Sequence, residues 1–241
     1  MASATPCEAQ IKIGSLLKRL GLFITLEGID GSGKSTHQRL LVNHLRALGY
    51  RVCATREPGG TAMGEQIRRL FFLPSRGQRS RRSSKRHPLT ELALMYAARA
   101  QHLDEVIRPA LARGEVVISD RFNDASRAYQ GYGRKLGIRT VESLDRIICG
   151  RTQPDLTILL DVDPRTAFTR VRGRAARGNK RIGVFEAQGL NFQSLVRAGY
   201  LAIARRDPRR VKVVHAGGPA AQVQAMIRRL VERLLPRHKG R

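Results

Sequence analysis

The chain has 241 residues, and 41% of them are hydrophobic, which is enough to bury a core and excludes a wholly disordered protein. No apolar stretch approaches the roughly 18 residues that a membrane-spanning helix needs, so we do not expect an integral membrane protein. The 45 Lys and Arg against 19 Asp and Glu give a formal charge of +26, which favours polyanionic partners, either nucleic acid or phosphorylated small molecules.

The first 20 residues are expected to form an N-terminal extension, and a regular pattern begins near residue 22. From there, apolar strands alternate with helices. The expected strands are 22–26, 51–55, 116–119, 156–160 and 211–214. The expected helices are one from the glycine-rich turn to about 48, then 62–71, 89–113, two within 124–150, 164–174, 186–206 and 220–235. The helix at 89–113 is expected to kink at Pro109. Strands that are apolar throughout indicate a parallel sheet covered on both faces. The expected fold is therefore α/β, a single three-layer α/β/α domain over 21–241 with a five-stranded parallel sheet.

A glycine-rich segment follows the first expected strand. Residues 28–35 read Gly-Ile-Asp-Gly-Ser-Gly-Lys-Ser and match G-x-x-x-x-G-K-[ST], the P-loop pattern, between a strand and a helix. Backbone N–H groups of such a loop converge on phosphate oxygens, Lys34 neutralises the β- and γ-phosphates, and the hydroxyl of Ser35 ligates Mg²⁺. The expected ATP-binding residues are Gly28, Ile29, Asp30, Gly31, Ser32, Gly33, Lys34, Ser35 and Thr36. The P-loop indicates a nucleoside triphosphate but does not choose among enzyme classes.

Five motifs narrow the choice. They are Phe-Ile-Thr-Leu-Glu-Gly at 23–28, Thr-Arg-Glu-Pro-Gly-Gly-Thr at 55–61, Ala-Arg-Ala-Gln-His at 98–102, Asp-Arg-Phe at 120–122 and Ser-Arg-Ala-Tyr-Gln-Gly-Tyr-Gly-Arg at 126–134. With these motifs in this order, the chain resembles the bacterial thymidylate kinases, which are P-loop nucleoside monophosphate kinases, over about residues 22–215. The resemblance implies phosphorylation of dTMP to dTDP with ATP and Mg²⁺, for dTTP biosynthesis, by a homodimer.

The resemblance also implies where the acceptor phosphate binds. Arg68 and Arg121 are expected to hold it, and Asp30 is expected to face the acceptor nucleotide. The residues suit this chemistry, because phosphoryl transfer brings two anions together and cations must surround the reaction centre. Arg121 follows an expected strand, at the carboxyl edge where parallel sheets bind their ligands.

The base of the acceptor has its own expected residues. By resemblance, Arg99 reaches the thymine, Ser126 and Gln130 hydrogen-bond the pyrimidine edge, and Tyr129 crowds the 2′ position of the sugar. Met95 stands where the family has a phenylalanine that stacks on thymine, and a thioether can still pack against a ring. No general base is required, because the acceptor phosphate is already nucleophilic and catalysis rests on positioning. The histidines at 37, 44 and 102 are therefore expected in packing or surface roles.

The transition-state arginine is expected in a lid at about 170–186, because the variable P-loop positions contain no arginine. Arg174 is the first choice by alignment, with Arg172 and Arg177 as further lid residues, so the expected catalytic residues are Lys34, Arg121 and Arg174. A guanidinium of this kind bridges donor and acceptor phosphates. At 183–184 the chain reads Gly-Val where the family has Asp-Arg, which removes one acid–arginine pair.

Three alternatives stay open on the sequence. Met95 permits a kinase of another nucleoside monophosphate, and the charge of +26 with the basic loop at about 74–88 permits a nucleic-acid-binding P-loop ATPase. The altered segment 183–184 permits an impaired relative that binds nucleotide without efficient transfer. Nucleic-acid binding from charge alone would be nonspecific. Three cysteines without a C-x-x-C pair are typical of the reducing cytoplasm and argue against a disulfide framework or a zinc site.

Overall fold

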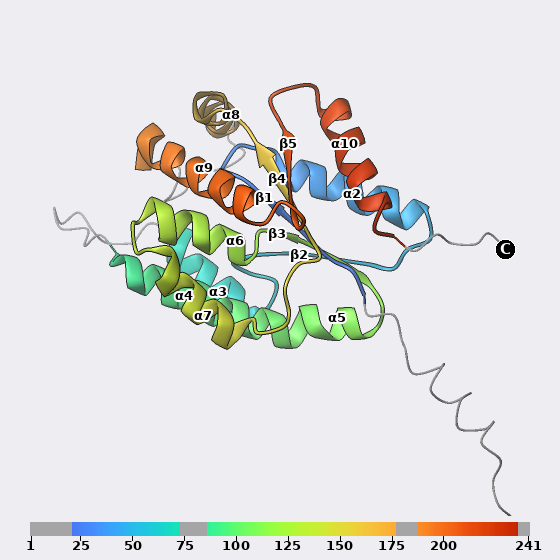
Figure 1. Ribbon diagram of the computed structural model, residues 1–241, viewed down its shortest axis with the longest axis horizontal. Helices are drawn as coiled ribbons and strands as arrows, with labels where there is room; N and C mark the ends of the chain where they lie inside the picture. Colours follow the sequence, from blue (N-terminus) through green and yellow to red (C-terminus); the bar gives the residue numbers. More distant parts are fainter. Residues whose placement is uncertain (1–20, 73–85, 177–187, 236–241) are drawn as a thin grey trace, which may run out of the picture.

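Five parallel strands form one sheet in the computed structural model, which describes residues 21–72, 86–176 and 188–235 (Figure 1). The strands are β1 Phe23–Glu27, β2 Val52–Arg56, β3 Val116–Asp120, β4 Leu156–Asp161 and β5 Val211–His215. Their order is β2-β3-β1-β4-β5, and every neighbouring pair is parallel. The expected five-stranded parallel sheet is confirmed, and the carboxyl end of β1 lies between those of β3 and β4.

The helices occur where the pattern placed them, with shifted ends. They are α2 Lys34–Ala47, α3 Ala62–Phe72, α4 Pro88–His102, α5 Arg108–Ala112, α6 Asn123–Ser126, α7 Ile138–Ile148, α8 Pro164–Ala176, α9 Gly189–Arg206 and α10 Ala220–Glu232, with π-helical turns η1 Leu103–Ile107 and η2 Arg127–Gly133. No helix within the described ranges is long and apolar enough to cross a membrane.

The expected kink at Pro109 is corrected by the structure. The irregularity lies before the proline, in η1, where the backbone N–H of Arg108 donates to the carbonyl of Leu103, five residues earlier. Pro109 then falls in the first turn of α5, where a missing N–H needs no helical partner. The chain therefore accommodates the proline by a wider turn rather than by a break at the proline itself.

Helices cover both faces of the sheet, as the three-layer prediction requires. Figure 1 shows α2 and α10 together on one side, and α3, α4, α5 and α7 on the other. Alternate residues of β1 supply the two cores: Ile24 and Leu26 pack in the cluster with α2 and α10, whereas Phe23 packs in the opposite cluster. Because both faces are covered, β1 is buried at every position.

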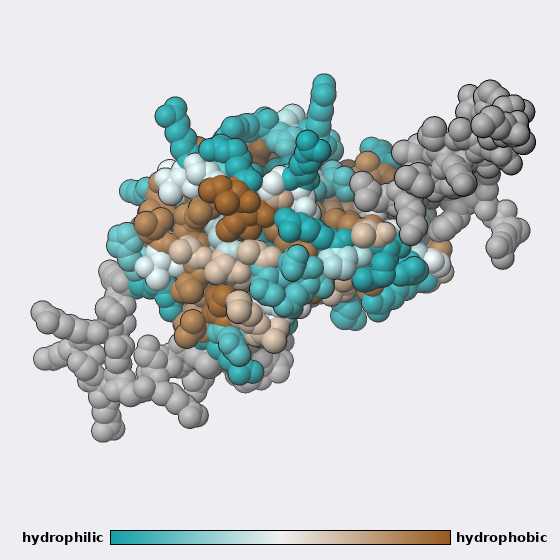
Figure 2. Space-filling model, turned by 90° about the horizontal axis from the view of Figure 1, so that it is seen from below, coloured by the Kyte–Doolittle hydropathy of each residue, from teal (hydrophilic) through white to brown (hydrophobic). Residues whose placement is uncertain are grey.

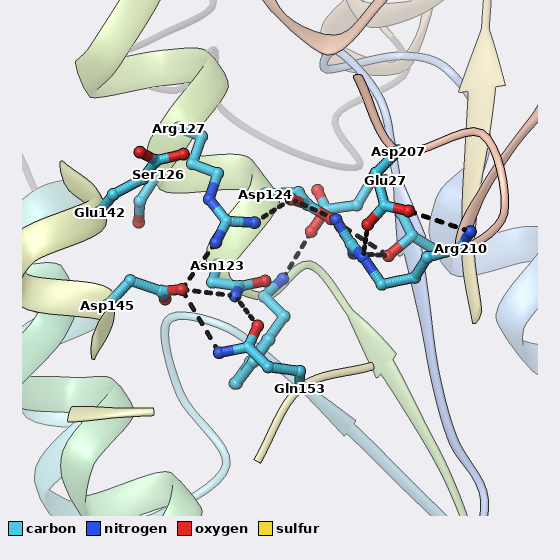
Figure 3. Close-up of polar contacts among 12 residues, drawn as sticks. Glu27, Asn123, Asp124, Ser126, Arg127, Glu142, Asp145, Gln153, Asp207 and Arg210 are labelled. Carbon is cyan, nitrogen blue, oxygen red and sulfur yellow. Dashed lines mark hydrogen bonds and ion pairs between the residues drawn. The ribbon is translucent and has the colours of Figure 1, made fainter. Parts of the chain in front are cut away.

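A buried network of charged residues holds α6 against the sheet (Figure 3). Asp124, only 1% exposed, lies between Arg210 and Arg127 and accepts hydrogen bonds from both, at 2.6 Å in each case. It also accepts from the hydroxyl of Thr157 on β4, and Arg127 continues the network to Asp145 on α7 at 2.7 Å. Burial by itself raises the pKa of Asp124, but the hydrogen bonds and charges of the two arginines hold it below its ordinary value. These ion pairs fix the start of α6, which carries expected site residues.

Candidate active site

The loop after β1 has a backbone that favours glycine. Gly31 has φ = +88°, and a Cβ atom there would lie 2.4 Å from the carbonyl oxygen of Ala167. Gly28 also has a positive φ, and its Cβ would approach the carbonyl of Leu160 to 2.6 Å. Side chains at either position would clash with neighbouring backbone, so only glycine allows this tight turn into α2.

Lys34 is the first residue of α2, and its ammonium folds back over the loop. The Nζ atom donates to the carbonyls of Ile29 at 2.9 Å and Gly28 at 3.1 Å, and the residue is 7% exposed. Burial, together with the nearby charge of Arg121, lowers the pKa of Lys34 to about 8. The structure therefore places the amino group of Lys34 against the carbonyls of the loop, close to the charge of Arg121.

Ser35 brings the loop into contact with β3. Its hydroxyl donates to the Oδ2 atom of Asp120, the last residue of that strand, at 2.7 Å. A hydroxyl beside a carboxylate supplies the oxygen donors that Mg²⁺ prefers. Sequence reasoning assigned only Ser35 to the metal; the available signal for Asp120 was an acidic residue that ends an apolar strand.

The backbone of Arg121 adopts an unusual conformation. Its φ is +74°, in the left-handed region that residues other than glycine rarely occupy. The surrounding structure imposes it, because the N–H of Arg121 donates to the carbonyl of Leu26 and its carbonyl accepts from the hydroxyl of Ser119 at 2.7 Å. Strain of this kind persists where the neighbours over-determine it, and it is typical of functional sites.

The guanidinium of Arg121 connects four groups. Its Nη2 atom donates to the Oδ1 atom of Asp30 at 2.6 Å and to the hydroxyl of Tyr129 at 3.1 Å. Its Nη1 atom donates to the carbonyl of Gly28 at 3.0 Å and to the hydroxyl of Tyr200 at 3.1 Å. Burial alone disfavours the charged form, but the surrounding oxygens raise the pKa of Arg121 well above its ordinary value. Arg121 is therefore a fixed cation beside the P-loop.

Asp30 directs both carboxylate oxygens to residues that follow β3. Its second oxygen, Oδ2, accepts from the hydroxyl of Tyr129 at 3.2 Å. Burial by itself raises the pKa of Asp30, but the charges of Arg121 and Lys34 hold it below the ordinary value. The structure thus brings together three of the residues that the sequence assigned to the acceptor nucleotide: Asp30, Arg121 and Tyr129.

Glu27 and Tyr200 were not selected from the sequence, yet they adjoin Arg121. Glu27 ends β1 and has 0% exposure; its Oε1 atom accepts from the backbone N–H of Phe122 and its Oε2 atom from the hydroxyl of Tyr200, both at 2.7 Å. Burial raises the pKa of Glu27 to about 7, although the charge of Arg121 opposes the shift. Tyr200 lies on α9, 173 residues along the chain from Glu27.

Arg99 lies in a second buried cluster. The residue is 2% exposed, and its Nε atom donates to Glu57 at 2.8 Å, while His102 bonds the other oxygen of Glu57 at 2.9 Å. The Nη2 atom donates to the hydroxyl of Ser126 at 3.1 Å and to the carbonyl of Phe122 at 3.0 Å. The Nη1 atom is buried and has no hydrogen-bond partner among the described residues. Sequence reasoning missed Glu57, and it gave His102 only a packing or surface role.

The remaining acceptor candidates lie on neighbouring helices. Arg68 on α3 donates to the carbonyl of Pro58 at 2.9 Å, and burial, with the charges of Arg56 and Arg121, lowers its pKa. Met95 on α4 is 9% exposed and packs in the same apolar cluster as Tyr129. Gln130, the next residue on η2, is 2% exposed. Arg68 is close enough to Arg121 for their charges to interact, and Met95 shares an apolar cluster with Tyr129.

The lid residues are only partly described. Arg172 lies on α8, with its guanidinium carbon 5.6 Å from the ring centre of Phe168. Arg174 belongs to α8 by its backbone, but its side chain lies outside the described part, as do Arg177 and the altered pair at 183–184. The basic loop is also outside it over residues 73–85. The lid assignments therefore stay predictions.

Comparison with known proteins gives consistent results. A family model described as thymidylate kinase matches residues 26–227. A thymidylate kinase from Pseudomonas savastanoi pv. phaseolicola is 48% identical, over 91% of this chain and 99% of its own length. One from Syntrophotalea carbinolica is 44% identical, over 85% of this chain and 92% of its own length. The crystal structure of thymidylate kinase from Ehrlichia chaffeensis superposes with a TM-score of 0.68 at 30% identity, covering 88% of this chain and 98% of that one.

Proposed function

Because the chain belongs to the thymidylate kinase family, we propose that it transfers the γ-phosphate of ATP to dTMP, giving dTDP and ADP for dTTP synthesis. The observation that carries the proposal is the cluster of Arg121, Asp30 and Tyr129 beside the P-loop, at the carboxyl edge of the sheet. This cluster supports the proposal because it would hold the acceptor phosphate directly against the loop that binds the donor phosphates, and a nucleoside monophosphate kinase needs this juxtaposition.

The donor side uses the P-loop. The amides of residues 28–36 and the ammonium of Lys34 would hold the phosphates of ATP, with Lys34 exchanging its carbonyl partners for phosphate oxygens. Ser35 and Asp120 would hold Mg²⁺, since their oxygens already lie 2.7 Å apart. The ion would neutralise charge on the donor phosphates.

The acceptor side uses the two clusters. Arg121 would bind the acceptor phosphate through Nη2, with Arg68 adding a second charge, and Asp30 would turn from Arg121 to the acceptor sugar. The Nη1 atom of Arg99, which has no hydrogen-bond partner among the residues that the structure describes, is a buried donor suited to a thymine oxygen, because an unsatisfied buried donor is costly. Ser126, Gln130, Tyr129 and Met95 would complete the base and sugar pocket.

Chemistry then needs charge stabilisation rather than a base. We propose that Arg174, with Arg172 and Arg177, supplies the cation of the lid at about 170–186, within a single domain that spans 21–241. The closed lid would exclude water from the phosphates. We also propose a cytoplasmic homodimer, supported by family membership. The dimer is further supported by exposed apolar side chains on α3 and α7, such as Met63, Leu70 and Ile147. These helices lie at the bottom of Figure 1, and Figure 2 shows apolar surface on that side.

A coupled ADP-release assay with dTMP, dUMP, dCMP and GMP tests the proposed reaction. We expect the highest kcat/KM with dTMP, and no acceptor-dependent ADP release by Lys34→Ala. A preference for another monophosphate would identify a different kinase. Hydrolysis stimulated by DNA but not by any monophosphate would support a nucleic-acid-dependent ATPase instead.

A further inference from the structure

A tyrosine on α9, Tyr200, places its hydroxyl between the guanidinium of Arg121 and the carboxylate of Glu27. The hydroxyl of Tyr200 accepts from Nη1 of Arg121 at 3.1 Å and donates to Oε2 of Glu27 at 2.7 Å. Tyr200 and Glu27 are 2% and 0% exposed, so water does not replace these contacts. α9 comes this close because Gly199 has no side chain: a Cβ there would lie 2.7 Å from the ring of Tyr132 on η2.

A hydroxyl suits this bridge, because it can accept one hydrogen bond and donate another. Arg121 is a donor, and the carboxylate of Glu27 is an acceptor whose other oxygen already accepts from the N–H of Phe122. The group between them must therefore accept on one side and donate on the other. A phenyl ring of the same size would leave Oε2 of Glu27 buried without its donor and would leave Nη1 with only the carbonyl of Gly28.

The two terminal nitrogens of Arg121 have different kinds of partner. Nη1 is held by the protein, through Gly28 and Tyr200, whereas Nη2 contacts Asp30 and Tyr129, residues of the proposed acceptor site. Because a guanidinium is planar and rigid, hydrogen bonds that hold one of its nitrogens also fix the direction of the other. Fixing Nη1 therefore sets the direction in which Nη2 points.

We propose that Tyr200 is a positioning residue for acceptor binding: by bridging Arg121 to Glu27 it aims Nη2 of Arg121 at the acceptor phosphate. The inference rests on the proposed function, in which Arg121 holds that phosphate. Tyr200 itself touches neither substrate, and its effect passes through Arg121.

Tyr200→Phe tests the bridge, because it removes one oxygen and keeps the ring in the core. We expect the KM for dTMP to rise about tenfold, as for a lost hydrogen bond to a charged group, while the KM for ATP stays within about twofold. The melting temperature should also fall by a few degrees, because the buried Oε2 atom of Glu27 loses its donor, but a loss of stability alone would not separate the two KM values. The matched control is Tyr132→Phe, on the helical turn that packs against Gly199, which should leave both KM values unchanged. An unchanged KM for dTMP, or equal rises for both substrates, would overturn the proposal.

Glu27→Gln provides an independent second variant. Its amide would donate to the oxygen of Tyr200, compete with Arg121 and leave the hydroxyl proton without an acceptor, so the KM for dTMP should rise here too. In the double variant, the rise in the KM for dTMP should be smaller than the product of the two single rises, because both substitutions break the same bridge. A rise equal to that product would contradict the proposal. If the wild-type enzyme does not phosphorylate dTMP, the proposed function is wrong. If the wild-type enzyme is active but Tyr200→Phe does not change the KM for dTMP, only the positioning role of Tyr200 is wrong.

Discussion

Two carboxylates of the site differ in the charge of their partners. Asp30 pairs with the guanidinium of Arg121, which keeps its pKa low despite burial. Glu27 is more enclosed, with 0% exposure against 25% for the side chain of Asp30, and its donors among the described residues are the neutral N–H of Phe122 and the neutral hydroxyl of Tyr200. Desolvation therefore dominates at Glu27 and raises its pKa to about 7. Two acidic side chains within one short segment of the chain thus titrate in different ranges.

The raised pKa of Glu27 predicts a pH-dependent stability. The folded protein binds this proton more tightly than the unfolded chain does, so the contribution to the free energy of unfolding is fully present below the ordinary pKa of 4.5 and is lost as the pH rises through about 7. Relative to Glu27→Gln, the wild-type protein should therefore lose up to about 3 kcal/mol between pH 4.5 and pH 8. Denaturant unfolding of both proteins across this range measures the difference, and parallel pH profiles would contradict it.

Glu57 offers a second test at the residue scale. Glu57→Gln would leave the buried charge of Arg99 uncompensated, and we expect it to lower the free energy of unfolding by about 3–5 kcal/mol. Glu65→Gln is the control, because its ion pair with Arg56 is exposed and should be worth about 1 kcal/mol at most. Equal losses in the two variants, measured by urea unfolding, would count against a special role for the buried pair.

Among the elements, α6 and η2 carry much of the proposed acceptor pocket, and packing rather than length stabilises them. α6 has only four residues, yet Asp124 at its second position is held by Arg127 and Arg210. The following π-helical turn, η2, contains Tyr129 and Gln130. Wide turns of this kind are frequent at functional sites. The ion pairs thus anchor a short irregular element that has little intrinsic helical stability.

The element α8 carries the proposed transition-state cation. Arg174→Ala is expected to lower kcat by about 10³ while the KM for dTMP changes little, because the guanidinium would act mainly on charge in the transition state. Arg165→Ala, an exposed arginine at the start of the same helix, is the control and should keep kcat near the wild-type value. Turnover of Arg174→Ala within a few-fold of wild type would show that the lid cation is another residue.

For the whole molecule, the structure shows how the formal charge of +26 is distributed between the interior and the surface. Acidic residues that lie in the interior, such as Asp124, Asp145 and Glu57, are paired with arginines that are buried (Arg99) or half-buried (Arg127). Their charges are therefore cancelled inside, and the excess of cations remains toward solvent. Such a surface attracts phosphorylated substrates and, at low salt, any nucleic acid.

The homodimer is the prediction at this scale. Exposed apolar side chains on α3 and α7 would be buried between copies, so light scattering after gel filtration should give about twice the chain mass of 26.9 kDa. Leu70→Glu, at a residue 59% exposed, should shift the protein toward monomer, whereas Leu48→Glu, 48% exposed on the α2 side, should not. A monomeric wild-type protein at micromolar concentration would refute the dimer.

The sequence by itself determined the order of elements, the parallel sheet and the P-loop, because apolar periodicity and glycine spacing are local signals. It also placed Arg121 at the end of β3, since motif and strand end coincide there. The contacts that complete the site were decided only by the tertiary structure. Asp120 meets Ser35 across 85 residues, and Tyr200 meets Glu27 across 173. Whether such a side chain faces a partner, another helix or water depends on how distant elements pack, and no pattern within one segment of the chain records that.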